Sequence, residues 1–327
     1  MKSWLSLCLF MLISQAVYAD DMRPASLTIK SIDNKIFDIV WKLPLKSGKT
    51  PPLSVTFDEQ TMIVGTTRSR KTNTAVIEKW SVERKQGLTG FTVYVDGLTK
   101  TNKNVLLRII DKKQQTITTA LNADQQSFSV SGKEDLKTEN TILTYIVLGI
   151  EHILIGLDHL LFIACLVYIS GTQTKLLMTI TGFTVAHSIT LILAATDVLN
   201  IPIPPVEAVI ALSIVFLACE IAKNNKDSLS LSYPVLVSSS FGLLHGFGFA
   251  SVLADIGLPE TEKLMALICF NIGVEIGQLL FVAALFIIFY VVSKLYKPLT
   301  KDTLRFPVSY LCGALASIWM LERLAAF

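Results

Sequence analysis

The charged residues of this chain are distributed so unevenly that they divide it into two parts of different chemistry. Residues 20–139 contain 19 Lys or Arg and 14 Asp or Glu, whereas residues 140–327 contain only 9 and 12. Charged residues make up 17% of the whole chain, against about 25% in an average soluble protein. This pattern excludes an ordinary soluble enzyme, a disordered chain and a coiled coil. The net charge of +3 is too small to indicate a nucleic-acid partner.

The first 19 residues have the pattern of a secretory signal peptide. Lys2 precedes an apolar run from Trp4 to Ile13, and Val17 and Ala19 are the small residues expected before a cut after Ala19. None of the 5 cysteines falls in residues 20–139, so we expect this part to be exported and to fold without disulfides.

Residues 20–132 read as an extracytoplasmic all-β domain. Short runs of alternating apolar and polar residues recur between turn signals, which is the pattern of an antiparallel sandwich. The runs are Ser26–Ile32, Phe37–Leu43, Leu53–Phe57, Ala75–Val82, Phe91–Val95, Asn104–Ile110, Thr116–Leu121 and Ser127–Val130. The domain has no histidine and no visible catalytic set, so we expect it to bind a periplasmic partner or to cover the membrane part. Residues 133–140 form a polar linker.

Residues 141–327 predict an all-α six-helix transmembrane bundle. The six apolar segments are roughly 142–169, 176–195, 205–222, 233–254, 264–292 and 306–326. The first and fifth exceed the ~20 residues that cross a bilayer, so they must tilt, break or begin at the interface. Seven basic residues fall in loops of one side, namely Lys175, Lys223, Lys226, Lys294, Lys297, Lys301 and Arg305. The positive-inside rule makes that side cytoplasmic. We therefore expect a multi-pass protein of a bacterial inner membrane, with the β domain and the C-terminus outside.

The apolar segments contain polar groups that a bilayer tolerates poorly. All 4 histidines lie here, and His152 and His159 share one face if the first span is a continuous helix. A charged group at mid-membrane costs on the order of 2.5–3.5 kcal/mol on insertion scales. We therefore expect these groups to face each other instead of lipid. The expected metal-binding set is His152, Asp158, His159, His187, His245 and Glu275, and the expected supporting set is Glu151, Thr184, Ser188, Glu207, Asn271 and Gln278.

Three interpretations of this polar set remain open. Its members could form a hydrogen-bond network that fixes helix packing, relay protons, or bind a metal ion. Imidazole and carboxylate ligands suit nickel, cobalt, zinc or Fe(II), and the absence of clustered thiols disfavours Cu(I) and thiolate zinc. Glu207 follows two prolines at the outer start of the third span, where a carboxylate either caps the helix or attracts cations.

Five motifs in these spans together resemble the HupE/UreJ family of bacterial membrane proteins. The motifs are Glu151–Phe162, Phe183–Leu191, Val206–Ser213, Gly242–Ala250 and Phe270–Gln278. The resemblance covers all six spans, and the stretch Gly90–Gly97 is similar to the front domain of longer members. It implies permeation of nickel, or of cobalt, to supply a hydrogenase or urease. Larger nickel and cobalt transporters have a His-x4-Asp-His motif. Here the stretch from His152 to Asp158 and His159 is one residue longer, so identical coordination does not follow.

Two other functional classes remain beside a nickel or cobalt permease. An intramembrane metal-dependent hydrolase would hold zinc with three histidines and use Glu275 or Asp158 as the general base. A non-catalytic scaffold or receptor would use the spans as an anchor and present the β domain to a partner. Metal flux would favour the permease. Bound zinc without flux would favour the hydrolase, and the absence of both bound metal and flux would favour the scaffold.

Overall fold

The computed structural model describes residues 25–325 except for short gaps. These gaps are residues 46–47, 73–74, 102–103, 114, 131–137, 197, 200, 226, 257–259 and 296–299. The predicted signal peptide and most of the predicted linker therefore lie outside the described residues. The chain forms two compact units. One unit comprises Asp21–Ile146 and Val252–Cys269, and the other includes Val147–Ser251 and Phe270–Phe327.

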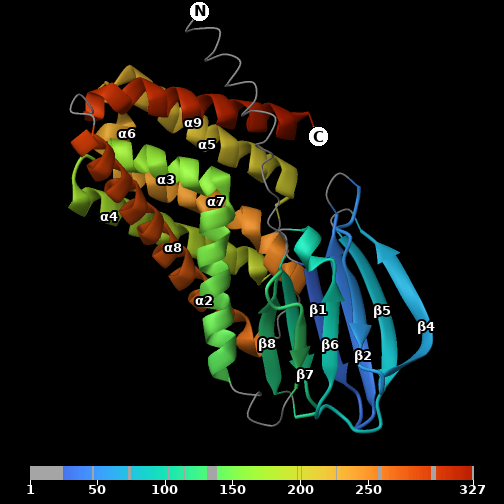
Figure 1. Cartoon of the computed structure of the whole chain (residues 1–327). Helices are drawn as coiled ribbons and strands as arrows, with labels where there is room; N and C mark the ends of the chain where they lie inside the picture. Colours follow the sequence, from blue (N-terminus) through green and yellow to red (C-terminus); the bar gives the residue numbers. More distant parts are fainter. Residues whose placement is uncertain are drawn as a thin grey trace, which may run out of the picture. The chain divides into compact units, whose positions relative to one another are not determined.

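The first unit contains nine described strands in two sheets (Figure 1). The strands are β1 (Ala25–Ser31), β2 (Ile36–Pro44), β3 (Ser54–Phe57), β4 (Met62–Lys71), β5 (Ala75–Glu83), β6 (Thr92–Asp96), β7 (Val105–Ile110), β8 (Thr116–Leu121) and β9 (Ser127–Ser129). A short 3-10 helix, η1 (Leu98–Lys100), follows β6. One sheet has the order β4-β5-β2-β1-β7-β8, and the other has the order β3-β6-β9.

The two sheets share one apolar core, because alternate residues of their strands point inward. In β2, Phe37, Ile39 and Trp41 are buried, and the aromatic rings of Phe37 and Phe91 lie 5.5 Å apart. The predicted β region is confirmed, and the sandwich arrangement stays a prediction. The antiparallel expectation is wrong at one ladder, because β1 and β7 pair in parallel. Alternating polarity shows which face of a strand is buried, but it carries no information on ladder direction.

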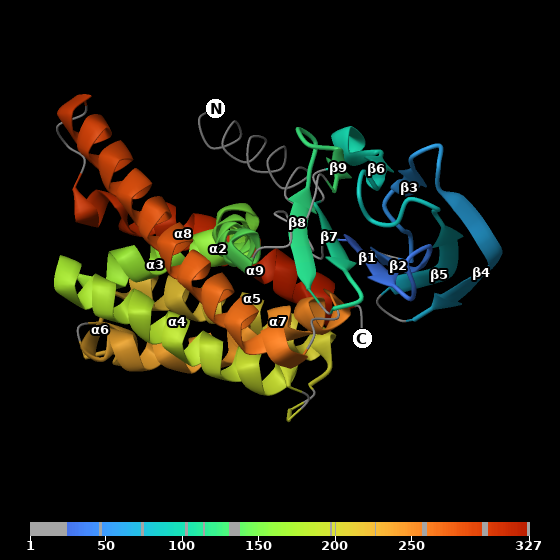
Figure 2. The ribbon, with the colours of Figure 1, turned by 90° about the horizontal axis from the view of Figure 1, so that it is seen from below.

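Strand β4 is the one described strand that the sequence analysis missed. All ten of its residues are exposed, and it forms an outer edge of the larger sheet (Figure 2). Its register with β5 shifts between Val64 and Arg68, next to Gly65 at a φ of 79°. An edge strand that buries neither face has no alternating apolar pattern, so the signal used for the other strands was absent.

A buried ion pair ties the strands together at one end. Arg84, whose side chain is 3% exposed, lies with its Nε 3.3 Å from Asp58 Oδ2 and donates to the carbonyl oxygens of Gly87 and Thr89. Burial raises the pKa of the Asp58 carboxyl, but hydrogen bonds from the Thr92 N–H and a threonine hydroxyl, together with Arg84, hold the pKa below its usual range.

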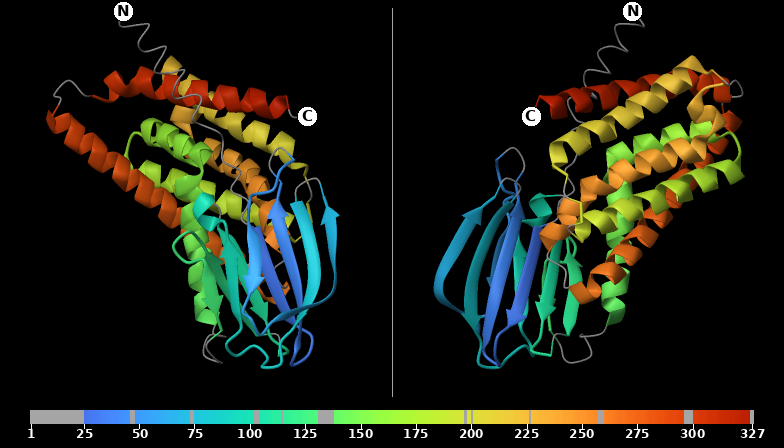
Figure 3. Two further views of the ribbon diagram at one scale, coloured as in Figure 1. Left: turned by 45° about the vertical axis from the view of Figure 1, so that its right-hand side comes forward. Right: turned by 180° about the vertical axis from the view of Figure 1, so that it is seen from behind.

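The described helices of the helical part correspond to the predicted apolar segments, except for the short α6, which lies between the third and fourth segments. They are α2 (Thr138–Ile155), α3 (Leu157–Ser170), α4 (Gln173–Ala195), α5 (Ile203–Lys223), α6 (Leu229–Ser232), α7 (Pro234–Ile256), α8 (Glu260–Leu295) and α9 (Lys301–Leu324). Helices α5 and α9 run side by side (Figure 3). A β-sheet region followed by a helical region with apolar candidate spans is thus confirmed.

The helices that could cross a membrane account for part of the predicted spans. Among the described residues, four helices are long and apolar enough to cross a membrane, and the bent pair α2 and α3 makes a fifth candidate. Helix α7 occupies the position of the predicted fourth span. Six spans therefore stay a prediction.

The first predicted span is broken. Helix α2 ends at Ile155, and α3 begins at Leu157 after a bend of 74° (Figure 1). Gly156 lies at the bend with extended backbone angles. His152 and His159 therefore lie on different helices, and the condition for sharing one face, a continuous helix, is not met. A break was one of the three expectations for this long segment, and the bend agrees with it.

Candidate functional site

Three histidines from three helices lie next to one another in the helical unit. The ring centroids of His152 on α2 and His159 on α3 are 4.6 Å apart, and those of His159 and His245 on α7 are 5.7 Å apart. All three side chains are buried, with relative exposures between 1% and 8%. We call these three residues the histidine cluster. The bend at Gly156 turns α3 sharply after α2, and the two rings meet across this turn.

Gly156 permits close packing inside the bend. A Cβ atom at this position would lie 2.6 Å from His159 Nδ1 and 2.8 Å from the carbonyl oxygen of His152. Both contacts are shorter than real Cβ atoms adopt, so only glycine fits without displacing a neighbour. The shape of the histidine cluster thus depends on a residue that has no side chain.

Asp158 lies at the start of α3, directly beside the histidine cluster. Its Oδ1 accepts a hydrogen bond of 2.9 Å from the backbone N–H of His159 and lies 2.9 Å from the ring Nδ1 of the same residue. A carboxylate in the first turn of a helix is stabilised by the exposed N–H groups there. Asp158 therefore places a negative charge against an imidazole of the cluster.

The fourth histidine, His187 on α4, is connected to the cluster through an aromatic ring. Phe183 stacks on His187 with centroids 5.9 Å apart and contacts His245 at 5.1 Å. The ring of Phe162 lies 5.0 Å from His245, and that of Phe270 lies 5.4 Å from His152. These phenylalanines surround the imidazoles with apolar surface, which lowers the local dielectric constant and strengthens electrostatic interactions.

The polar stripe of α8 packs against threonines of α4. Thr181 Oγ1 donates a hydrogen bond of 2.6 Å to Glu275 Oε1, and Thr184 Oγ1 donates one of 2.8 Å to Gln278 Oε1. Gln278 and Thr184 are buried, whereas Glu275 is half-buried and Thr181 is exposed. The contact that the structure describes for Glu275 is therefore a neutral hydroxyl on α4.

The other expected supporting residues have local or separate roles. Ser188 donates to the carbonyl oxygen of Thr184 at 2.7 Å, so its hydroxyl bonds to its own helix. Asn271 is buried on α8, and Glu151 is half-buried on α2. Glu207, near the start of α5, lies 4.0 Å from Arg323 Nε on α9, and its carbonyl oxygen accepts a bond of 3.2 Å from Arg323.

The histidine cluster is a group of neighbouring rings and not a formed coordination sphere. Within the described part of the chain, no group of three or more His, Cys, Asp or Glu side chains is arranged to hold a metal ion. The cysteines at 165, 219, 269 and 312 are free thiols. What the arrangement offers chemically is several buried nitrogen atoms and a carboxylate, which suit borderline divalent cations better than soft Cu(I).

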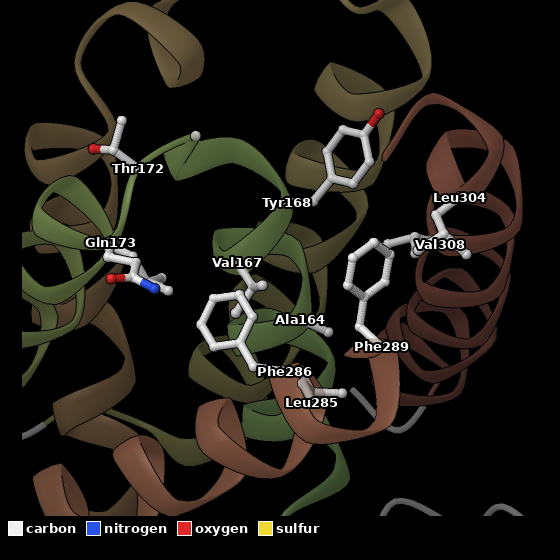
Figure 4. A pocket seen from close by; sticks show the side chains of 12 residues that line it. Ala164, Val167, Tyr168, Thr172, Gln173, Leu285, Phe286, Phe289, Leu304 and Val308 are labelled. Atoms are coloured by element: carbon white, nitrogen blue, oxygen red, sulfur yellow. The ribbon is translucent and has the colours of Figure 1, made fainter. Parts of the chain in front are cut away.

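An apolar groove elsewhere in the helical unit does not belong to this cluster (Figure 4). It has a volume of about 320 Å³ and lies among α3, α4, α8 and α9. Figure 4 shows Phe286, Phe289 and Leu285 along it, with the hydroxyl of Tyr168 at its rim. Among the described residues that line it there is no histidine or carboxylate, so it lacks the ligand types of the histidine cluster.

Besides the phenylalanines, four described residues that the sequence analysis did not single out contact the expected set. They are Gly156, Thr181, Ser213 and Arg323. Thr181 and Arg323 carry a detectable signal, because each is a polar residue within an apolar segment. The sequence holds no such signal for Ser213 and Gly156, since a lone serine or glycine is ordinary in membrane helices.

The comparison with known families agrees with this architecture. The sequence model described as HupE / UreJ protein matches residues 128–323, which is more than half of the chain. The chain belongs to the HupE/UreJ family. The match includes all four histidines of this HupE/UreJ protein and runs from before α2 to residue 323 in α9. No curated protein matches the chain.

Proposed function

We propose that this HupE/UreJ protein is a membrane permease for a divalent transition metal ion, nickel or cobalt. The expected ligands are His152, His159, His187 and His245 with Asp158, and Glu275 is a ligand or charge partner. The observation that carries the proposal is the histidine cluster, in which three buried imidazoles from α2, α3 and α7 lie in ring contact beside a carboxylate.

The physical argument starts from the cost of the cation in an apolar region. A dication bound only by neutral imidazoles keeps both positive charges in a low dielectric, which is strongly unfavourable. The carboxylate of Asp158, 2.9 Å from His159 Nδ1, would offset part of that charge. A site that combines neutral nitrogens with one carboxylate can therefore take up a cation without holding it irreversibly.

A resident metal ion and a transported metal ion place different requirements on their ligands. A resident catalytic metal requires three or four ligands held in fixed geometry. A transported ion has to enter and leave, so its ligands need to close around it only while it passes. The rings of His152, His159 and His245 lie in contact but on three different helices, which supports a site whose ligands can close around a passing ion.

We further propose the orientation predicted from the basic loops, with the cytoplasmic ends at Lys175, Lys223 and Lys294. The β domain then lies on the periplasmic side of a bacterial inner membrane. There it would meet the ion before the helices do, or bind a periplasmic partner protein. Supply of nickel to a hydrogenase or urease would be the cellular purpose of the uptake.

The test combines uptake of radioactive nickel by cells with elemental analysis of the purified protein. His159→Ala should abolish uptake and lower the bound metal, because His159 contacts both other rings of the cluster. Cys165→Ser is the matched control, because its thiol is buried in the same helix but lies outside the cluster. Uptake should survive this change.

The alternatives give different results in the same experiment. Stoichiometric zinc without nickel flux would replace the permease by an intramembrane hydrolase. Neither metal nor flux would leave a scaffold or receptor. Loss of uptake in Cys165→Ser to the same extent as in His159→Ala would show that the loss is not specific to the imidazole, and it would refute the assignment of uptake to the histidine cluster.

A further inference from the structure

His245 makes one hydrogen bond in the described structure, and its partner determines the state of the ring. The Nε2 atom of His245 on α7 lies 3.1 Å from the hydroxyl oxygen of Ser213 on α5. Both side chains are 1% exposed. The contact therefore lies in the dry interior, where the direction of a hydrogen bond has a large energetic consequence.

The direction of this bond follows from a second contact of Ser213. Its Oγ lies 2.6 Å from the carbonyl oxygen of Ile210. A carbonyl oxygen only accepts hydrogen bonds, so at that distance the single hydroxyl proton must lie between the two oxygens. Towards His245, Ser213 can then act only as an acceptor, and the proton of their contact belongs to Nε2.

A neutral imidazole carries one N–H, so protonation of Nε2 leaves Nδ1 with a lone pair. The Nδ1 atom of His245 is buried and makes no hydrogen bond to any residue that the structure describes. A buried acceptor of this kind is energetically unfavourable when it stays unsatisfied. A cation bound at Nδ1 would remove that cost.

We propose that Ser213 is a positioning residue that holds His245 as the Nε2–H tautomer, so that Nδ1 is its cation-binding atom. The assignment of the tautomer does not depend on the proposed function. Only the identity of the bound cation rests on the proposed function. Hydrogen bonds of this kind raise the basicity of a ligand nitrogen and fix the orientation of its ring.

The surrounding helices keep the ring in place. A Cβ atom at Gly246 would lie 2.4 Å from the carbonyl oxygen of His187, so α7 contacts the backbone of α4 directly next to His245. Phe162 and Phe183 contact the ring, with centroids 5.0 Å and 5.1 Å away. Because the rings of Phe162 and Phe183 pack against it, the imidazole has little room for a half-turn that would exchange the positions of Nδ1 and Nε2.

The tautomer can be measured on the purified, metal-free protein. Nitrogen-15 spectra of protein labelled at histidine distinguish protonated from unprotonated ring nitrogens, and the His245 signals are those lost in His245→Gln. The expected result is a protonated Nε2 and an unprotonated Nδ1. A protonated Nδ1 in the parent protein would overturn the proposal without any variant.

Three variants separate positioning from packing. Ser213→Ala should give a mixture of tautomers and weaken binding of Ni²⁺ by about 10–100-fold. Ser213→Thr keeps a hydroxyl at the same position and should restore both properties. Ser238→Ala is the matched control, because Ser238 on α7 is also a buried serine and donates to the Thr179 carbonyl oxygen at 3.0 Å. It should leave the spectrum and the affinity unchanged.

Failure of this inference differs from failure of the proposed function. An unchanged tautomer in Ser213→Ala, or an equal loss of affinity in Ser238→Ala, would refute the role of Ser213 while nickel uptake continues. The expected tautomer and its loss in Ser213→Ala, in a parent protein that binds no Ni²⁺, would support the positioning role and refute the permease.

Discussion

Replacement of Gly156 by alanine should damage the histidine cluster while the helices stay in place. The added Cβ would lie 2.6 Å from His159 Nδ1 and 2.8 Å from the His152 carbonyl oxygen. Ordinary contacts of such atoms begin near 3.4 Å. Either the imidazole or the backbone that carries the other imidazole must therefore move by several tenths of an ångström. Metal–ligand distances tolerate only about 0.2 Å.

We expect Gly156→Ala to lower Ni²⁺ affinity by at least about tenfold, the lower end of the range for disturbed ligand orientation. Titration calorimetry of the purified protein measures the affinity, and quantitative blotting of membranes checks that the variant is inserted. Gly313→Ala is the control, because its nearest atom would be the side chain of Ala218 at 3.2 Å, away from the cluster. Parental affinity in Gly156→Ala would refute the assignment of His152 and His159 to one site.

Three other predictions test the topology, the carboxylates and the β domain. A cysteine at Asn225 should resist an impermeant thiol reagent added outside and one at Pro204 should react, and the reverse labelling would contradict the orientation. Glu275→Gln should abolish nickel uptake at matched membrane levels, whereas Glu207→Gln should slow it mainly at low nickel; equal losses would refute this distinction. The lowered pKa of Asp58 contributes stability that is complete above about pH 4 and is lost as the pH falls further. Asp58→Asn should therefore cost about 1.5–3 kcal/mol at neutral pH and remove this dependence from acid unfolding curves.

Most strands and helices could be predicted from their apolar residues. In the strands apolar and polar residues alternate, and in the spans the apolar runs are long enough to cross a bilayer. All eight predicted β runs are found as strands, and each predicted span contains a helix. Strand β4 was missed because all of its residues are exposed. The parallel pairing of β1 and β7 was missed because two strands far apart in the sequence can meet in either direction. Strand pairing is a property of the whole sheet and not of one segment.

The candidate site was predictable in composition but not in geometry. The cost of polar groups in apolar helices identified the four histidines as one group, and three of their rings do lie together. His152 and His159 come together across the break at Gly156 and not along one face of a continuous helix. The partners Ser213 for His245 and Thr181 for Glu275 depend on which helices are neighbours. Residue spacing within one helix holds no information on that choice.

A packing role for the histidines can be weighed against a ligand role from their hydrogen bonds. If the imidazoles served only to hold helices together, each would be expected to bond to a neighbouring helix. His245 does so through Ser213. For His187, which is 1% exposed, neither ring nitrogen has a hydrogen-bond partner among the described residues. An unsatisfied buried polar group costs about 1–3 kcal/mol.

Phenylalanine or leucine could fill the position of His187 beside Phe183 without that cost, so helix packing does not account for an imidazole there. The same reasoning applies to Nδ1 of His245, which is buried and unsatisfied although the other nitrogen of its ring is bonded. Both residues keep lone pairs or N–H groups in an apolar interior where nothing described uses them. The free energy that this arrangement costs in the absence of an ion is free energy that a bound cation would recover. The unsatisfied nitrogens therefore favour a ligand function over packing, and the neighbouring apolar rings would make that interaction stronger.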